Sequence, residues 1–264
     1  MAGKREEHPF FFIQMSDPQF GMYSANEDFS KETELFEKAI LHVNRLRPAF
    51  VLNTGDLVNE PCDEKQLTGA MRVIQNLDKG IVIYSVPGNH DVADAPTKET
   101  LGWYRKQVGK DWYSFDYGGW HFIGLNSCIM ANAEHVQQDV EKQWNWLNND
   151  LEQAVSTINS HIIIFMHHPL FLNDPEEADS YFNIPLKMRQ VYLNLFRKYD
   201  VKAVLAGHLH QNSLATNFRF EVVTTGPVGM PLGGDISGLR IVKVYADHIE
   251  HRYFGLDDVI TLDF

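Results

Sequence analysis

Five short segments of the chain carry side chains that bind divalent metal ions. They combine carboxylates, carboxamides and imidazoles, and they read Asp17-Pro18-Gln19, Gly55-Asp56, Gly88-Asn89-His90-Asp91, His167-His168-Pro169 and Gly207-His208-Leu209-His210. Oxygen and imidazole donors of this kind are the usual protein ligands of Mg²⁺ and of first-row metals. A turn uses glycine and asparagine but has no need of His90 and Asp91, so the third segment is the most informative. Read together, the segments predict one dinuclear metal site.

Taken one at a time, some segments also have simpler interpretations. Asp17 and Asp56 are typical of turns at strand ends, and His167 and His168 are compatible with two solvent-facing imidazoles. Position favours the metal site, because each segment follows an apolar run that predicts a buried strand: residues 10–14, 50–53, 81–86, 162–166 and 201–205. Such strand ends meet at one edge of a sheet. If residues 208–210 are extended, the two imidazoles there face the same side.

The elements between these strands follow two different patterns. Leu35, Ala39, Val43 and Leu46 recur at helical spacing, with Ser30 or Asp28 as candidate caps and Pro48 as the stop, and residues 67–77 repeat the pattern. This alternation predicts parallel strands with right-handed crossovers.

Further along, residues 112–117 and 120–126, joined by Gly118 and Gly119, predict a β-hairpin. A helix follows with Trp144, Leu147, Leu151 and Val155 on one face, and residues 217–224, 239–245 and 248–254 form β segments without helices between them. The pattern alone therefore predicts one mixed sheet and one antiparallel sheet, packed face to face with helices outside.

Composition excludes several kinds of partner. The formal net charge of −12 argues against a basic nucleic-acid groove and against an anionic membrane surface, so we expect neither partner. No apolar run reaches the ~18 residues of a membrane span, and the polar start lacks the apolar stretch of a signal peptide. The two cysteines fit a reducing compartment, so we expect a cytoplasmic monomer, with a processed secretory form left open. Without repeats or linkers, residues 1–264 predict a single domain, with residues 1–8 as a disordered tail.

The motif series resembles that of the calcineurin-like metallophosphoesterases. Within that superfamily the chain is most similar to the calcineurin-like phosphoesterase domain-containing proteins. The resemblance extends beyond the ligand positions, and the shared stretches include residues 17–21, 125–127, 169–172, 181–183 and 238–240. The resemblance implies an α/β fold: a four-layer α/β/β/α sandwich of two mixed β-sheets flanked by helices, with the dimetal site at the carboxyl ends of the strands.

The same resemblance implies the ligands of each metal. Metal one takes Asp17, Gln19, Asp56 and His210, and metal two takes Asp56, Asn89, His167 and His208. We favour His167 over His168, because the second position is apolar in some related chains. Gln19 departs from the usual histidine of the superfamily. Its carboxamide oxygen suits Mn²⁺ or Mg²⁺ better than softer ions, so these metals are favoured and zinc or iron stays possible.

The chemistry that this site predicts is hydrolysis of a phosphate ester. Two divalent cations, two carboxylates and a bridging hydroxide leave a net charge of about +1, which attracts a phosphate dianion. A metal-bound hydroxide is the expected nucleophile. His90 is expected to protonate the leaving alkoxide as general acid, or else to be merely structural. Asn59 stands where related phosphatases carry an aspartate, so its side-chain oxygen is a candidate to hold His90; the alternative is an exposed loop residue.

Substrate contacts are expected from Asn89, His90, Tyr181 and Arg189. The acidic loop 173–182 is rooted at the metals, where it either favours a substrate with a cationic portion or is simply solvated. Arg189, on the following helix, is the candidate phosphate clamp.

The leading hypothesis is therefore a phosphomonoesterase for a phosphoprotein or a small phosphate ester, with phosphoserine and phosphothreonine as candidate substrates. The alternatives are a phosphodiesterase or nucleotide diphosphatase, and a non-catalytic metal-binding scaffold.

Overall fold

A five-stranded sheet carries the first three of the five motif segments shortly after its strands. The computed structural model describes residues 9–156, 161–217 and 220–264. In this part of the chain the sheet has the order β11 (Ile249–Gly255), β10 (Gly238–Val244), β1 (Phe10–Met15), β2 (Phe50–Asn53), β3 (Val82–Ser85). β1, β2 and β3 are parallel, whereas β10 is antiparallel to both of its neighbours. The predicted tail, residues 1–8, lies outside the described residues.

The second sheet is six-stranded. Its order is β4 (Tyr113–Tyr117), β5 (Trp120–Gly124), β6 (His161–Phe165), β7 (Val201–Ala206), β9 (Phe220–Thr224), β8 (Ser213–Asn217). β5, β6, β7 and β9 run parallel, and only the outer strands β4 and β8 are antiparallel to their neighbours. Both sheets are therefore mixed, and the pattern-based prediction of an antiparallel second sheet was wrong. The late strands divide between the sheets, because β10 pairs with β1 while β9 pairs with β7.

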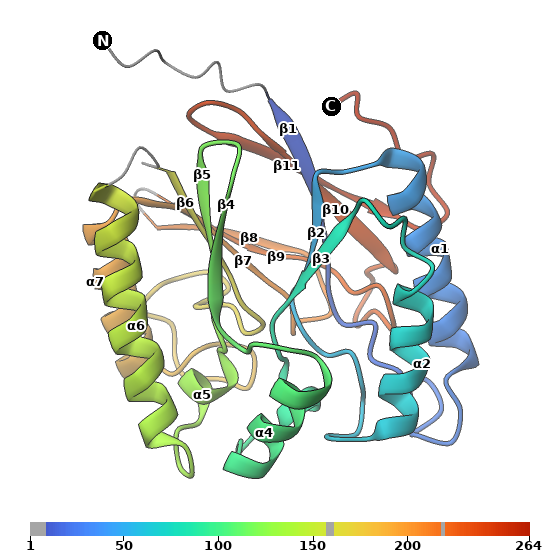
Figure 1. The fold of residues 1–264 in the computed structure, drawn as a ribbon, viewed down its shortest axis with the longest axis horizontal. Coiled ribbons are helices and arrows are strands. Elements are labelled where there is room, and N and C mark those ends of the chain that lie inside the picture. Colours follow the sequence, from blue (N-terminus) through green and yellow to red (C-terminus); the bar gives the residue numbers. More distant parts are fainter. Residues whose placement is uncertain (1–8, 157–160, 218–219) are drawn as a thin grey trace.

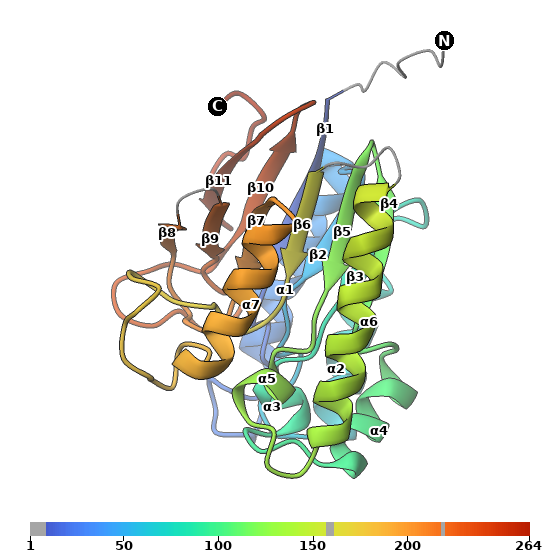
Figure 2. The same ribbon diagram turned by 90° about the vertical axis from the view of Figure 1, so that its left-hand side faces the viewer.

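Helices cover both outer faces of the paired sheets. α1 (Ser30–Leu46) and α2 (Glu64–Ile74) lie on the five-stranded sheet, and α6 (Gln137–Ser156) and α7 (Leu186–Lys198) lie on the six-stranded one (Figures 1 and 2). The short α3 (Asn89–Val92), α4 (Lys98–Gln107) and α5 (Cys128–Ala131) gather at the lower end of the molecule, where Figure 2 labels all three, and β1, β2 and β5–β7 run toward this end. The expected four-layer α/β/β/α arrangement is confirmed.

The core has three apolar layers because neighbouring strand residues point to opposite faces. On β1, Phe12 packs between the sheets while Ile13 packs under α1 and α2. Phe12 stacks on Phe50 with ring centroids 5.0 Å apart, and each such fully buried ring contributes about 1.5–3 kcal/mol. A third cluster fills the space between the six-stranded sheet and α6 and α7. These layers hold the strand ends rigidly.

The predicted elements differ from the observed ones mainly at their edges. α1 begins at Ser30, whose N–H donates to the Asp28 carboxylate, and it ends one residue before Arg47 in the left-handed region. Two expectations about burial were wrong. β3 is a half-exposed edge strand because nothing pairs with its outer side in the described sheet, and Val155 on α6 is 45% exposed because Ala154 takes the buried position.

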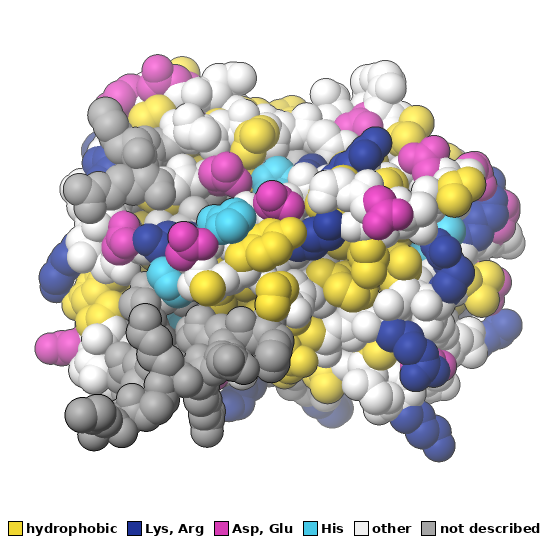
Figure 3. Space-filling view, turned by 90° about the horizontal axis from the view of Figure 1, so that it is seen from above, with side chains coloured by type: hydrophobic (Ala, Val, Ile, Leu, Met, Phe, Trp, Pro, Cys, Tyr) yellow, Lys and Arg dark blue, Asp and Glu magenta, His cyan; other side chains and the backbone are white. Residues whose placement is uncertain are grey.

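The surface at the other end of the sheets has mixed charge. Seen from above, Lys and Arg side chains alternate with Asp and Glu side chains and with apolar ones (Figure 3). The residues drawn in colour there form no continuous basic surface. Within the described ranges, no helix combines the length and the apolar character that crossing a membrane requires.

Candidate metal centre

Most of the predicted ligands sit on strained backbone directly after a strand. Five of the seven have a φ angle between 41° and 68°: Asp17, Gln19, Asp56, His208 and His210. For residues other than glycine this left-handed conformation costs of order 1–3 kcal/mol each, and it persists where the surrounding fold imposes it. Residues 208–210 are not extended, so the condition under which the two imidazoles would face the same side is not met. Their sharply turned backbone sends the two imidazoles into two neighbouring groups of ligands.

The first group consists of Asp17, Asp56 and His210, whose ligand atoms lie within 4.8 Å of one another. His210 Nε2 lies 3.5 Å from Asp17 Oδ1, and the His208 N–H donates to the same carboxylate at 3.2 Å. Gly207 allows this approach, because a Cβ there would lie 1.8 Å from Ser16 Oγ and 2.7 Å from Asp17 Oδ2.

Gln19 lies beside this group. Its N–H donates to the Asp56 carbonyl at 2.9 Å, and its side-chain Oε1 is buried without a hydrogen-bond donor.

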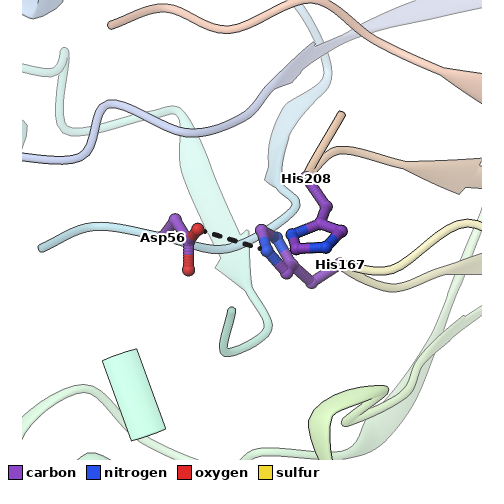
Figure 4. A group of neighbouring side chains, drawn as sticks. All are labelled: Asp56, His167 and His208. Carbon is purple, nitrogen blue, oxygen red and sulfur yellow. Dashed lines mark ion pairs between the residues drawn. The ribbon is translucent and has the colours of Figure 1, made fainter. Parts of the chain in front are cut away.

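The second group consists of Asp56, His167 and His208, again within 4.8 Å. Figure 4 shows the Asp56 carboxylate facing the His167 ring, with Oδ2 3.2 Å from Nε2, and the His208 ring beside it. Asn89 Oδ1 lies 3.0 Å from the same His167 Nε2, so its oxygen points at this group. Asp56 belongs to both groups. One carboxylate between two sets of donors is the geometry that bridges a pair of metal ions.

Two glycines and one buried carboxylate hold Asp56 in place. A Cβ at Gly88 would lie 2.0 Å from Asp56 Oδ1, and a Cβ at Gly55 would lie 2.7 Å from His167 Nδ1. Asp91 accepts hydrogen bonds from the N–H groups of Asp56 and Gly88 at 2.9 and 2.8 Å. Burial and the neighbouring Asp56 raise the pKa of Asp91 to about 7. The turns after β2 and β3 are thus closed around the bridging carboxylate.

The buried carboxylates of Asp17 and Asp56 favour the binding of cations at the centre. Burial raises the pKa of Asp17 above its ordinary value. Burial also acts to raise the pKa of Asp56, but the neighbouring His167 outweighs this effect and holds the pKa of Asp56 below its ordinary value. Burial opposes protonation of His167, but Asp56 outweighs it and raises the pKa of His167 to about 9. Among the described residues, Asp17 and Asp56 form ion pairs only with histidines. Two buried carboxylates and the unpaired Gln19 oxygen are the donor set that divalent ions fit.

Main-chain carbonyls orient the imidazoles. A carbonyl oxygen only accepts, so the ring nitrogen that faces it carries the hydrogen and the other nitrogen is left for the centre. Four histidines are held in this way: His90 Nδ1 by Asn59 (2.6 Å), His167 Nδ1 by Thr54 (2.8 Å), His208 Nε2 by Tyr181 (2.9 Å) and His210 Nδ1 by Met230 (2.6 Å).

His168 is outside both ligand groups although it is buried. Its Nδ1 lies 3.0 Å from Ser127 Oγ. The same hydroxyl oxygen accepts hydrogen bonds from the main-chain N–H groups of His167 and His168 at 3.1 and 2.8 Å. Burial and the nearby His208 hold the pKa of His168 well below its ordinary value. Sequence reasoning did not single out the role of Ser127. The stretch 125–127 was noticed only as part of the family resemblance.

Asn59 does not hold His90 through its side chain, so that expectation was wrong. Its main-chain carbonyl does so, while its Oδ1 accepts a hydrogen bond from Gln19 Nε2 at 3.1 Å. The loop turns the carboxamide away from His90 and toward the first ligand group.

Tyr181 and an unpredicted aspartate fix Asn89. Asn89 Nδ2 donates to Asp94 Oδ1 at 2.8 Å and to Tyr181 Oη at 2.9 Å. The Asp94 carboxylate only accepts when ionised, so it keeps the nitrogen of Asn89 on its side and the oxygen toward His167. Asp94 belongs to none of the five segments. The only sequence signal for its contact with Asn89 is that the two residues are five positions apart in the chain.

The structure gives Arg189 no contact that fits a phosphate clamp, because its side chain is fully buried and its hydrogen bonds go to main-chain carbonyls. Nε donates to the carbonyl of Ile184 at 3.0 Å, and Nη1 donates to those of Pro175 and Glu177 at 3.0 and 2.8 Å. The Glu177 carboxylate in turn accepts the N–H groups of residues 172–174. Arg189 and Glu177 therefore brace the loop from inside, and the loop brings Tyr181 to the site.

The fold and this donor set define a class of protein. Residues 12–212 match the family model described as calcineurin-like phosphoesterase, so the chain belongs to that family. It is a hydrolase that acts on phosphate esters, and its centre is built for divalent metal ions.

Three similar proteins illustrate the relationship. The serine/threonine-protein phosphatase CPPED1 of Bos taurus is 35% identical over 95% of this chain and 85% of its own length. A 3',5'-cyclic-nucleotide phosphodiesterase, alr5338 of Nostoc sp., is 28% identical over 81% of this chain and 80% of its own. A dimetal phosphatase from Danio rerio superposes with a TM-score of 0.69 at 16% identity, covering 94% of this chain and 96% of its own, and so shares the fold.

Proposed function

We propose that the chain is a dinuclear metal-dependent phosphomonoesterase whose substrates carry phosphoserine or phosphothreonine. The observation that carries the dinuclear part is Asp56, which belongs to both ligand groups. The substrate class is supported by the phosphatase that is 35% identical over nearly the whole chain.

Each metal position has a defined donor set in this proposal. Metal one is held by Asp17, Gln19, Asp56 and His210, and metal two by Asp56, Asn89, His167 and His208. Oxygen donors outnumber nitrogen donors at metal one, which favours Mn²⁺ or Mg²⁺. When bound, the two ions lower the pKa of water and offset the charge of the phosphoryl oxygens.

His90 is the proposed general acid. The main-chain N–H of His90 donates to Asp56 Oδ1 at 2.9 Å, which keeps the residue beside the bridging carboxylate. The His90 ring is half-buried. Because the hydrogen on Nδ1 is donated to a carbonyl, Nε2 is the atom that faces the leaving oxygen, and it gives up a proton when the ring is in its doubly protonated imidazolium form. Asn89 and Tyr181 remain the proposed substrate contacts, with Tyr181 55% exposed at the rim.

Release of phosphate from matched substrates tests the proposal. The metal-free protein, prepared with EDTA, is compared before and after adding Mn²⁺, Mg²⁺ or Zn²⁺, on p-nitrophenyl phosphate, its bis ester, ADP-ribose and a phosphoserine peptide. We expect Mn²⁺ or Mg²⁺ to restore hydrolysis of the monoester and the peptide. Turnover of the bis ester alone would instead support a phosphodiesterase, the second candidate, which the Nostoc relative favours. The cytoplasmic location and the monomeric state stay predictions.

A further inference from the structure

Gln19 is the end of a chain of four hydrogen-bonded carboxamides, which we call the amide relay: Gln19, Asn59, Asn26 and Gln66. Gln19 Nε2 donates to Asn59 Oδ1 at 3.1 Å, and Asn59 Nδ2 donates to Asn26 Oδ1 at 2.7 Å. Gln66 Nε2 donates to the same Asn26 oxygen at 2.9 Å. At the far end, Gln66 Oε1 accepts the N–H groups of Asn59 and Glu60 at 2.8 and 2.9 Å.

The direction of every hydrogen bond in the relay follows from this far end. Main-chain N–H groups can only donate, so the oxygen of Gln66 must face them and its nitrogen must face Asn26. Asn26 therefore presents oxygen and Asn59 presents nitrogen where these two meet. The oxygen of Asn59 then faces Gln19, which must offer its nitrogen. Gln19 Oε1 is left on the other side, buried and without a donor.

The two ends of the relay, Gln19 and Gln66, are buried in the fold, whereas Asn26 in its middle is exposed. Gln66 is 3% exposed, and its N–H donates to Asp63, the residue that caps α2. Gly21, with a φ of 109°, passes over the relay. A Cβ at this glycine would lie 2.6 Å from Gln66 Nε2 and 2.9 Å from Asn26 Oδ1. Helix α2 and the loop after β1 thus hold the hydrogen bond between Gln66 and Asn26 in place.

We propose that Gln66, Asn26 and Asn59 are positioning residues that hold the oxygen of Gln19 toward metal one. This rests on the proposed function, because it concerns one of the two proposed metal positions. A free carboxamide presents oxygen or nitrogen with similar ease, and only the oxygen binds a cation. A relay that merely stabilised the loop would not determine which atom Gln19 turns inward.

Gln66→Glu tests the relay at its far end without touching a ligand. An ionised carboxylate keeps both main-chain donors but presents an oxygen to Asn26, where the wild type presents a nitrogen. The amides of Asn26, Asn59 and Gln19 must then turn over in sequence, which points the nitrogen of Gln19 at metal one. At about pH 8, we expect calorimetric titration of the metal-free protein to show Mn²⁺ binding at one position weakened about 10–100-fold.

A compensating substitution distinguishes positioning from damage. In Gln19→Glu both ends of the side chain are oxygens, so metal one keeps an oxygen ligand whichever way the relay runs. We therefore expect Gln66→Glu to weaken Mn²⁺ binding in the wild-type background and to leave it unchanged or improved in the Gln19→Glu background. Gln75→Glu, at the exposed end of the same helix, adds the same charge outside the relay and should bind two ions like the wild type.

A second pair of variants serves if Gln66→Glu does not fold, as judged by circular dichroism. Asn59→Asp keeps an acceptor for Gln19 Nε2 and should retain both ions, whereas Asn59→Leu removes the acceptor and should weaken one. The proposal is overturned if Asn59→Leu and Asn59→Asp bind Mn²⁺ equally well, or if Gln66→Glu weakens binding equally in both backgrounds. Failure of the proposed function is separate: the wild type would then bind two ions without hydrolysing any phosphate ester.

Discussion

His90 Nδ1 lies 2.6 Å from the main-chain carbonyl oxygen of Asn59, and the side chain of Asn59 points instead to Gln19. One loop residue thus serves the two halves of the centre through different atoms. Its main chain fixes the tautomer of the proposed general acid, while its side chain orients a proposed metal ligand. Substitution of the Asn59 side chain should therefore affect metal one and spare the tautomer of His90.

Replacement of His90 by alanine should separate metal binding from turnover. Because His90 contributes no proposed ligand atom, His90→Ala should retain two ions by elemental analysis. Loss of general-acid catalysis should lower kcat on an alkyl phosphate about 10²–10⁴-fold. The exposed His135→Ala is the control. Turnover at the wild-type rate would remove His90 from the mechanism.

No side chain can be accommodated at Gly88. In Gly88→Ala the new Cβ would lie 2.0 Å from Asp56 Oδ1, so the bridging carboxylate must move. We expect loss of at least one ion and destabilisation by about 1–3 kcal/mol. Gly102→Ala, on α4, is the matched control, because a Cβ there meets nothing within 4 Å and should stabilise the protein by about 0.4–1 kcal/mol. Equal metal content and melting temperature in the two variants would contradict this account.

Tyr181 and Asp94 share the nitrogen of Asn89 but should not be equivalent. Tyr181→Phe removes one neutral hydrogen bond worth about 1 kcal/mol, so kcat/KM should fall about fivefold with both ions retained. Asp94→Ala removes the charged acceptor and should weaken Mn²⁺ binding about 10–100-fold. Calorimetric titration and steady-state kinetics on both variants measure the difference. If the single substitution Tyr181→Phe already causes loss of a metal ion, then Asp94 does not suffice to orient Asn89.

Arg189 should matter for stability and not for phosphate affinity. Arg189→Leu leaves the carbonyls of Ile184, Pro175 and Glu177 without this donor, which should lower the free energy of unfolding by about 1–3 kcal/mol. Thermal unfolding and KM for p-nitrophenyl phosphate distinguish the two roles. Lys187→Leu removes an exposed cation from the same helix and serves as control. A raised KM at unchanged melting temperature would restore the clamp hypothesis.

His121, which belongs to neither ligand group, should make stability depend on pH. Burial opposes its protonation, but the carboxylates of Asp150 and Asp116, 2.9 and 2.7 Å from the ring nitrogens, outweigh it and raise the pKa of His121. The stabilisation is therefore complete below the unfolded pKa of about 6.5 and is lost as pH rises through the higher folded value. His121→Gln should flatten the fall of melting temperature in that window. The same slope in wild type and variant would contradict the assignment.

Much of the fold could be predicted because its signals are local. The apolar runs of β1, β2, β6 and β7 and the helical spacing of α1 depend only on neighbouring residues, and the hairpin after Trp112 has two glycines at its turn. The sheet assignment of the late strands could not be read in this way. Whether β9 and β10 join one sheet or two depends on pairing with β7 and β1, which are distant in the chain.

The sequence by itself determined which carboxylates and imidazoles come together in the centre, namely Asp17, Asp56, His167, His208 and His210, because ligand type and position after a strand are local properties that a resemblance can match. Only the tertiary structure decided how they are used. That Asp56 is shared, that a main-chain carbonyl holds His90, and that Gln19 Nε2 is tied to Asn59 all depend on contacts across 31 to 191 positions, as between His208 and Asp17. Such contacts leave no spacing in the chain, since they exist only once the two sheets are packed.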